Sequence, residues 1–283
     1  MPSTLDLRRR IRSVKNTGKI TKAMQMVAAA KMRKAQAAAV AGRPYDEVLR
    51  RVLALMRPNV DAGSHELLRE REVRKELIVI FSTDKGLAGA LNSNLFRELI
   101  NVDAASSVYV AVGRKGLQFL TRTRRDLIAD FPVSDNPEFR EIRTIGRFCM
   151  EKFTSGEVDR VRVLYSQFVN TLMQKPMLRT LLPIPAEDLP EENPLKGSAE
   201  YLFEPNEHAV LNAILPHYVN YELFQMVHDA RASEHSARMV AMKSATDNAK
   251  QLVKDLTLDL NKARQASITT ELLEITTAQL AVQ

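Results

Sequence analysis

The C-terminal part of the chain, from His217 to Gln283, contains neither glycine nor proline, and all ten glycines lie at or before Gly197. Because these two residues most weaken a helix interior, such a run predicts one uninterrupted helix. At 1.5 Å per residue it would be roughly 100 Å long. A helix of this length cannot stand alone in water, since its apolar stripe needs a partner.

The N-terminal segment 1–57 predicts a second long helix. Apolar residues recur at helical intervals from Leu7 to Ala39. Ser3 or Thr4 can cap its start, and Pro44 predicts a bend because it removes one backbone donor. The two helices lie at opposite ends of the chain, so the simplest pairing is with each other, as an antiparallel coiled coil. Homodimerisation of each helix is the alternative, which the weak heptads disfavour.

The middle of the chain, about Arg74 to Pro205, alternates between strand-like and helix-like segments. This alternation predicts an α/β sheet with right-handed crossovers. The expected strands are 75–81, 106–113, 159–169 and 177–185, and the expected helices are 91–100, 115–123 and 139–153. Asn92 or Ser93 is the candidate cap of the first of these helices. We therefore expect an N-terminal helix over 1–57, an inserted α/β domain over 74–205 and a C-terminal helix over 206–283.

The positive charge is concentrated at one end. The formal net charge is +7, yet segment 1–57 holds 14 Lys and Arg against three acids, an excess of +11. The rest of the chain is therefore at −4. The N-terminal helix has either an ordinary solvated basic face or a face that meets nucleic acid, anionic lipid or an acidic protein surface.

Several protein classes are excluded by composition. No apolar run is longer than that of Leu77–Phe81, which is far shorter than the roughly 20 residues of a membrane span. Cys149 is the single cysteine, which excludes an intramolecular disulfide and a cysteine-based zinc site. It lies in an apolar helical stretch, so we expect it to be a buried small hydrophobe. No secretory signal is visible at the start, and we expect a reducing compartment.

No motif indicates catalysis. Gly86 and Gly89 follow the first strand, where phosphates can bind, but their G-x-x-G spacing matches neither nucleotide-binding motif. A tight turn that packs on a neighbouring element is the better interpretation. The five histidines form no metal-binding pattern and there is no nucleophile elbow. We expect no cofactor, metal or catalytic residue.

Three segments carry a resemblance. Residues 11–36 (IRSVKNTGKITKAMQMVAAAKMRKAQ), 82–94 (STDKGLAGALNSN) and 232–275 resemble the gamma subunit family of F-type ATP synthases, and the likeness extends over nearly the whole length. The resemblance implies an asymmetric antiparallel coiled coil inside a hexamer of alpha and beta subunits. It also implies a Rossmann-like foot domain that sits, with the epsilon subunit, on the ring of c subunits. Ion-driven rotation would then change the nucleotide affinity of each beta site in turn.

The resemblance also assigns residues. Five would make coupling contacts with the beta subunits: Met24, Arg238, Gln265, Thr269 and Glu271. Three would belong to the foot that faces the c ring: Tyr201, Phe203 and Glu204. After Glu274 the sequence carries no charge, so the end of the helix would turn inside an apolar sleeve without breaking ion pairs.

The resulting hypothesis is a non-catalytic rotor subunit with no nucleic-acid partner and with only indirect membrane contact, through the c ring. One cysteine excludes the thiol switch of plant-type relatives, so we expect a bacterial protein at the cytoplasmic face of the inner membrane. Two alternatives stay open. The basic N-terminal helix also suits a nucleic-acid-binding coiled-coil hairpin, although interleaved aromatics are missing. The α/β segment also suits a nucleotide-dependent enzyme.

Overall fold

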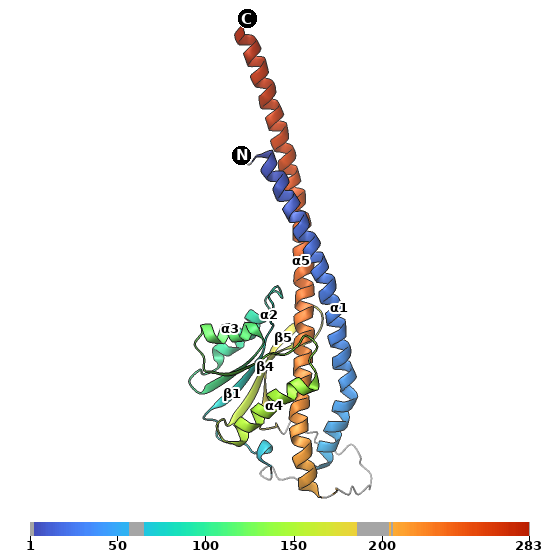
Figure 1. Cartoon of the computed structure of the whole chain (residues 1–283), viewed down its shortest axis with the longest axis vertical. Helices are drawn as coiled ribbons and strands as arrows, with labels where there is room; N and C mark the ends of the chain where they lie inside the picture. Colours follow the sequence, from blue (N-terminus) through green and yellow to red (C-terminus); the bar gives the residue numbers. More distant parts are fainter. Residues whose placement is uncertain (1–2, 57–64, 186–203, 205, 283) are drawn as a thin grey trace. The chain divides into compact units, whose positions relative to one another are not determined.

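The computed structural model describes residues 3–56, 65–185, 204 and 206–282 (Figure 1). The chain forms two compact units. We call Met1–Ala28 with Arg238–Gln283 the paired-helix unit, and Ala29–Ala237 the sheet unit. Two helices, α1 (Thr4–Met56) and α5 (Glu207–Val282), each contribute to both units.

Both long helices agree with the prediction, and α5 begins at Glu207, close to the expected start at 206. The helix therefore starts before the run without glycine and proline, and it includes Pro216. A proline in a helix interior costs about 3 kcal/mol. Its neighbours Leu215 and Tyr218 are buried in the core, and this packing offsets the cost. In α1 the helix likewise continues through Pro44.

The start of α1 is capped as predicted. The Ser3 hydroxyl accepts a hydrogen bond from the Asp6 amide at 3.1 Å and donates one to the Asp6 carboxylate at 2.7 Å. This arrangement satisfies one of the free amides of the first turn. Asp6 also lies in the first turn, where an acidic side chain stabilises the helix through its dipole.

In the paired-helix unit, α1 and α5 run antiparallel. The hydroxyls of Thr21 and Thr246 are 2.7 Å apart, and a methyl group placed on Gly18 would lie 3.4 Å from the Ala249 methyl. The residue numbers of both pairs add to 267, as expected for two antiparallel helices in one register. The predicted pairing of the two chain ends is therefore confirmed. Buried residues along this seam include Leu7, Thr21, Ala28, Met242, Thr246 and Leu256.

The sheet unit contains a five-stranded sheet in the order β3-β2-β1-β4-β5. The strands are β1 (Glu76–Phe81), β2 (Ser107–Val112), β3 (Leu127–Phe131), β4 (Arg160–Phe168) and β5 (Gln174–Leu182). The first four are parallel and β5 is antiparallel to β4. The predicted α/β fold is confirmed, and β3 is an additional edge strand.

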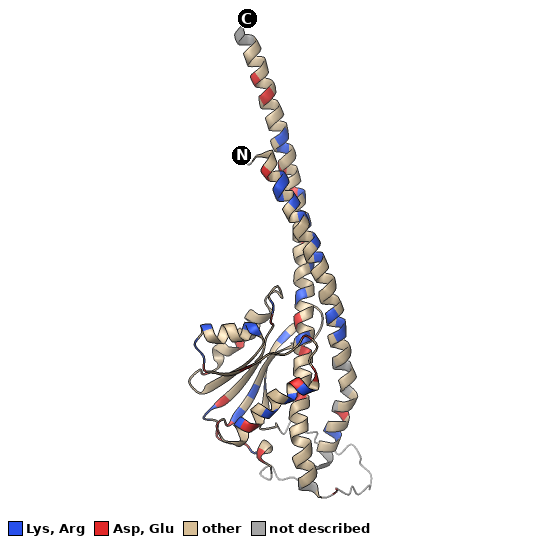
Figure 2. Ribbon diagram, viewed as in Figure 1, with Lys and Arg blue, Asp and Glu red and all other residues tan. Residues whose placement is uncertain are grey.

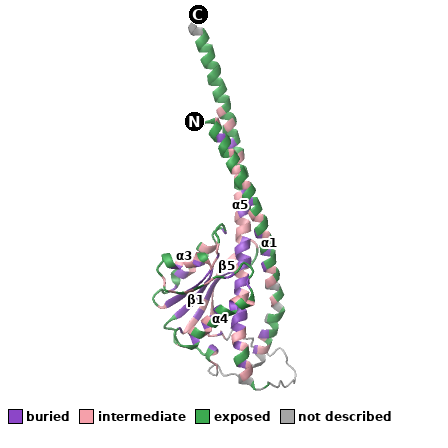
Figure 3. Cartoon of the chain, viewed as in Figure 1, coloured by how far each residue is buried: buried purple, intermediate pink, exposed green. Residues whose placement is uncertain are grey.

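Helices cover both faces of the sheet. They are α2 (Leu91–Arg97), α3 (Arg114–Arg122) and α4 (Phe139–Thr154), with short 3-10 turns η2 (Glu66–Leu68) and η3 (Glu98–Asn101). Residues of α2 and α3 pack with Ile78 and Ile80 on one face. On the other face, α4 and the first half of α5 pack over Val79. The purple stretch of α5 in Figure 3 is this buried half, so α5 belongs to the core of the sheet unit.

Two local predictions had different outcomes. Cys149 is fully buried, and burial raises the pKa of its thiol to about 12, so it is an inert apolar side chain as expected. The predicted caps of α2 are wrong: the N-cap residue is Ala90, without a side-chain hydrogen bond. The Asn92 amide instead donates to the Thr83 hydroxyl at 2.8 Å, which ties α2 to the loop after β1.

A buried carboxylate joins the amino ends of three strands. Glu76 on β1 accepts hydrogen bonds from Arg160 at 2.8 Å, from Arg162, and from the Ser107 hydroxyl at 3.1 Å. Burial alone would raise the pKa of Glu76, but hydrogen bonds and charge from Arg162 and Arg160 outweigh it and lower the pKa below 4.5. The ionised form is therefore stabilised in the folded chain.

This cluster predicts a pH-dependent stability. Since the folded pKa lies below the unfolded value of 4.5, the contribution of Glu76 is complete above that pH and is lost as the pH falls through the folded pKa. We expect Glu76→Gln to lower the free energy of unfolding by about 1–3 kcal/mol near neutral pH, because both arginines are partly solvated. The difference from wild type should shrink in acid. Urea unfolding at several pH values checks this, with the exposed Glu151→Gln as control. A difference that is independent of pH contradicts the assignment.

Candidate functional site

The usual ligand position of an α/β sheet is filled here by α5. In open sheets, ligands bind beyond the carboxyl ends of the strands where the strand order reverses, which in this sheet is between β1 and β4. The space at this point is lined by Phe81, Ser166, Val227 and Arg231, among others, and measures about 20 Å³. Such a cavity accommodates one water molecule, not a nucleotide.

The glycine-containing loop after β1 packs against α5. Leu87 and Gly89 have φ values of 63° and 58°, so the chain turns sharply before α2. The Thr83 hydroxyl donates to the Lys85 carbonyl at 2.8 Å and stabilises the turn. Asp84 faces α5, where its carboxylate lies 3.5 Å from the Arg231 guanidinium. The prediction that this loop is a tight turn packed on a neighbouring element is therefore confirmed, and the neighbouring element is α5.

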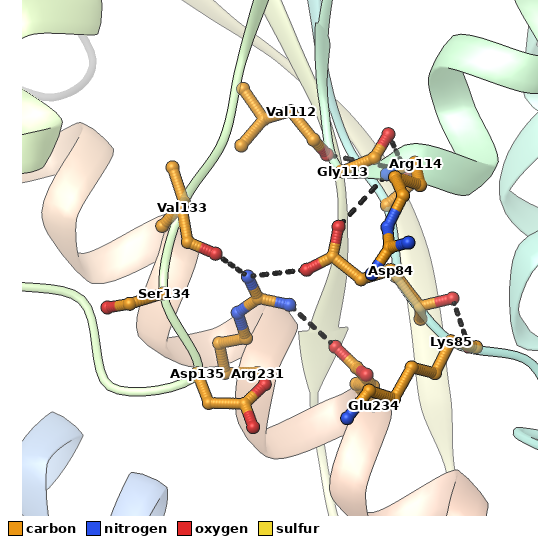
Figure 4. Close-up of polar contacts among 12 residues, drawn as sticks. Asp84, Lys85, Val112, Gly113, Arg114, Val133, Ser134, Asp135, Arg231 and Glu234 are labelled. Carbon is orange, nitrogen blue, oxygen red and sulfur yellow. Dashed lines mark hydrogen bonds and ion pairs between the residues drawn. The ribbon is translucent and has the colours of Figure 1, made fainter.

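Arg231 is the centre of a buried polar cluster (Figure 4). Its side chain is 5% exposed. The guanidinium donates to the Val133 carbonyl at 2.7 Å and to the Glu234 carboxylate at 2.8 Å, in addition to the pair with Asp84. The other oxygen of Asp84 accepts from the Arg114 amide at 3.0 Å, at the start of α3. One side chain of α5 thus contacts the loops after β1 and after β3.

A second cluster joins α1, α5 and β5. Glu222 on α5, with a side chain 6% exposed, lies 2.5 Å from Arg50 on α1 and 3.0 Å from Arg179 on β5. On the adjacent residue of α5, the Tyr221 hydroxyl donates to the Gly42 carbonyl of α1 at 2.5 Å. Both long helices are therefore fixed to the sheet unit by directional contacts.

The loop after β3 also reaches α1. Asp135 pairs with Lys31 at 2.5 Å. The hydrogen bond from Lys31 lowers the pKa of Asp135, with smaller contributions from the charges of Arg231 and His235. Because both partners are about half exposed, this pair contributes little to stability.

In the paired-helix unit, one end of α5 has no counterpart on α1. The register that pairs Thr21 with Thr246 places Thr4, the first residue of α1, opposite about Ala263. Residues 264–282 of α5 extend past that point, as the red end of the chain in Figure 1 shows. Four large apolar side chains of this end are 45–59% exposed: Ile268, Leu272, Leu273 and Ile275. Exposed apolar clusters of this kind mark interaction sites.

The coupling residues suggested by the resemblance all lie in the paired-helix unit. Met24 and Arg238 are half-buried, whereas Gln265, Thr269 and Glu271 are exposed on the end of α5. The Thr269 hydroxyl donates to the Gln265 carbonyl at 2.9 Å, which is a contact within one helical turn. Of the suggested foot residues, Glu204 is exposed, and Tyr201 and Phe203 lie outside the described residues.

A basic groove in the same unit was not predicted. It measures about 550 Å³, and its apolar lining includes Val14, Met26 and Val253. Four lysines also line it: Lys15, Lys19, Lys22 and Lys250. Figure 2 shows the basic residues of both helices in this unit. The sequence does contain a signal for this groove. Lys15, Lys19 and Lys22 are spaced by four and then three positions, and residues at such spacings share one face of a helix.

Within the described ranges, no group of three or more His, Cys, Asp or Glu side chains is placed to hold a metal ion. In the same part of the chain, no helix combines the length and the apolar character needed to cross a membrane.

These features define a class of protein. In the paired-helix unit, two long helices run antiparallel and α5 ends with several exposed large apolar side chains. In the sheet unit, the ligand crevice of an α/β sheet is filled by residues of α5.

Comparison with known proteins identifies the family. A family model described as ATP synthase matches residues 3–282. The ATP synthase gamma chain of Opitutus terrae is 50% identical, with 99% of each chain covered. That of Methylacidiphilum infernorum is 47% identical over the full length of both chains. The chain belongs to the gamma chain family of ATP synthase, so the resemblance found in the sequence is confirmed.

Solved structures agree in fold. The rotor of the Euglena gracilis mitochondrial ATP synthase gives a TM-score of 0.68 at 22% identity, with 94% of this chain and 98% of the other covered. The central stalk and c ring structure from Tetrahymena thermophila gives 0.61 at 24% identity, with 80% and 99% covered. At these identities the likeness concerns the fold of paired helices with an inserted sheet.

Proposed function

We propose that this chain is the central rotor shaft of an F-type ATP synthase and couples ion-driven rotation of a c ring to ATP synthesis or hydrolysis at beta-subunit sites. The observation that carries the proposal is the end of α5 beyond Ala263, where Ile268, Leu272, Leu273 and Ile275 are exposed and where the sequence carries no charge after Glu274. Such an end needs an apolar sleeve, and without charges it can turn there without breaking ion pairs. In this proposal, segments 1–57 and 206–283 are the shaft and 74–205 is the foot.

The partners follow from family membership and from surface chemistry. The shaft stands in a hexamer of alpha and beta subunits, and the foot sits with the epsilon subunit on the c ring. Tyr201, Phe203 and Glu204 are the foot residues that face the c ring. Met24, Arg238, Gln265, Thr269 and Glu271 contact the beta subunits. The subunit is then peripheral to the membrane, at the cytoplasmic face of a bacterial inner membrane.

Rotation changes nucleotide affinity because the shaft is asymmetric. A partner site can change its affinity only through contacts that differ between orientations of the shaft. The groove with Lys15, Lys19, Lys22 and Lys250 lies on one side of the paired helices and suits acidic loops. Exposed ion pairs contribute only about 0–1 kcal/mol each. Contacts of this strength form and break easily, as a turning surface requires.

The subunit itself is not catalytic in this proposal. The supporting observation is that Val227 and Arg231 of α5 occupy the crevice in which related folds bind nucleotides, where about 20 Å³ is left. The catalytic sites are on the beta subunits.

Co-purification of the tagged full chain tests the proposal. We expect alpha, beta and epsilon subunits to be recovered with it, in a complex whose ATP hydrolysis acidifies reconstituted vesicles. Recovery of the chain alone, or in a complex with nucleic acid that high salt dissociates, contradicts the proposal.

A further inference from the structure

The turns of α5 that cross the carboxyl edge of the sheet are buried and polar. Six of the nine residues from His228 to Ser236 have buried polar or charged side chains. Earlier turns of the same helix pack through apolar residues such as Val219 and Leu223. Apolar burial is non-directional, whereas hydrogen bonds weaken steeply with misalignment. The polar turns therefore define one rotational setting of α5 on the sheet unit.

These turns are held by several loops of the carboxyl edge. The Ser233 hydroxyl donates to the Ser166 carbonyl of β4 at 2.8 Å. The Ser236 hydroxyl donates to the Thr171 carbonyl, in the loop after β4, at 2.7 Å. Arg231 contacts the loops after β1 and β3. The contacts thus come from different strands that end at the same edge.

Arg231 is the charged member of this set. Its planar guanidinium donates in fixed directions, and here it contacts a carbonyl and two carboxylates while remaining 5% exposed (Figure 4). A helix with side chains is about 10–12 Å wide, so a rotation of about 20° would move the guanidinium by about 2 Å. That displacement exceeds the range of a hydrogen bond. Apolar contacts of the same helix would adapt to it.

Torque between the strands and loops of the sheet unit and α5 is carried by the contacts that join them. We propose that Arg231, with Asp84, Val133 and Glu234, fixes the rotational setting of α5 on the sheet unit, so that Arg231 is a positioning residue for torque transmission. This inference rests on the proposed rotor function. It explains why a charged cluster is retained where an apolar core would stabilise the fold equally well.

The test measures torsional stiffness in the assembled complex. The hexamer is immobilised and held by a non-hydrolysable ATP analogue, and a bead on the sheet unit reports the angular fluctuation. The variant is Arg231→Met with Glu234→Gln, which removes both buried charges; the Asp84 carboxylate loses its ion pair but is 27% exposed and keeps the hydrogen bond from the Arg114 amide. We expect the mean-square angular fluctuation to increase at least twofold, while the urea midpoint of the purified chain stays close to wild type.

The matched control is Arg125→Met. Arg125 is half-buried in the sheet unit and donates to the Leu99 carbonyl at 2.9 Å. Its described contacts are with the sheet unit's own strand β2 and turn η3, so its loss should not change the fluctuation. Wild-type fluctuation in the Arg231 double variant, or an equal increase in the Arg125 variant, overturns the inference.

If the double variant does not assemble, a milder variant tests the positioning role of Arg231. Asp84→Asn keeps an acceptor for the Arg114 amide but loses the charge that faces Arg231. We expect a smaller increase in fluctuation in the same direction, and no increase overturns the inference. If the wild-type complex does not rotate at all, the rotor function itself fails, and that outcome is distinct from a rotating complex with unchanged stiffness.

Discussion

Replacement of Met24 by lysine should uncouple proton pumping from ATP hydrolysis. Met24 is half-buried in the paired-helix unit, on a helix that is already strongly basic. In the proposed complex an added ammonium at this position forms a new ion pair with an acidic loop of a beta subunit. A fully exposed ion pair contributes about 0–1 kcal/mol. A pair that is shielded from bulk water contributes more, because the local dielectric constant is lower. It would hold the shaft in one orientation.

We expect ATP hydrolysis by the Met24→Lys complex to remain within about threefold of wild type, while the initial rate of vesicle acidification per ATP falls at least tenfold. A factor of ten corresponds to about 1.4 kcal/mol, the energy of one new contact of this kind. Asn16→Lys is the matched control, since Asn16 is exposed on the same helix, lies about 12 Å from Met24 along the helix axis, and does not line the basic groove. An equal loss of hydrolysis and acidification, or an equal effect of Asn16→Lys, contradicts the coupling role of Met24.

Charges placed at the end of α5 should prevent stable assembly. Leu272 and Leu273 are each 59% exposed in this chain, and the proposed apolar sleeve buries them in the complex. Burial of one leucine side chain contributes about 1.5–3 kcal/mol. Leu272→Glu with Leu273→Glu removes that contribution and adds the cost of burying two carboxylates. We expect at least a hundredfold lower yield of complex in reconstitution from separate subunits.

Two controls distinguish loss of binding in the apolar sleeve from unfolding of the chain itself. Trimming of 278–283 should leave assembly largely intact, because the apolar residues from Ile268 to Ile275 remain. Thermal unfolding of the double glutamate variant alone should match wild type, since the changed side chains have no described partner within the chain. Wild-type assembly of the glutamate variant contradicts the sleeve, and complete loss of assembly on trimming means that the last residues are an anchor.

The two long helices and their pairing could be predicted because the signals lie within each helix and extend over many residues. The absence of glycine and proline after Pro216 and the Ser3 cap are visible in the sequence, and each corresponds to an observed feature. The uninterrupted run begins only at His217, because Pro216 is a helix stop signal, whereas α5 itself begins at Glu207. In the folded chain, burial of Leu215 and Tyr218 outweighs that signal.

The contacts between α5 and the sheet could not be predicted. Arg231 has the sequence signature of an ordinary solvated arginine, and two of its three described partners, Asp84 and Val133, lie far away in the chain. Strand β3 was missed because it is short and only half-buried, with an aspartate at Asp130. Asn92 was assigned a capping role from its local position, whereas its partner Thr83 belongs to the preceding loop.

The central claim is that α1 and α5 form one shaft that turns within a surrounding hexamer. The most direct measurement is to immobilise the purified complex through its hexamer, attach a bead to the sheet unit and add ATP. The account predicts rotation in one direction, in three equal steps per turn, with a rate that follows ATP hydrolysis. Hydrolysis at the normal rate while the bead stays still would contradict it.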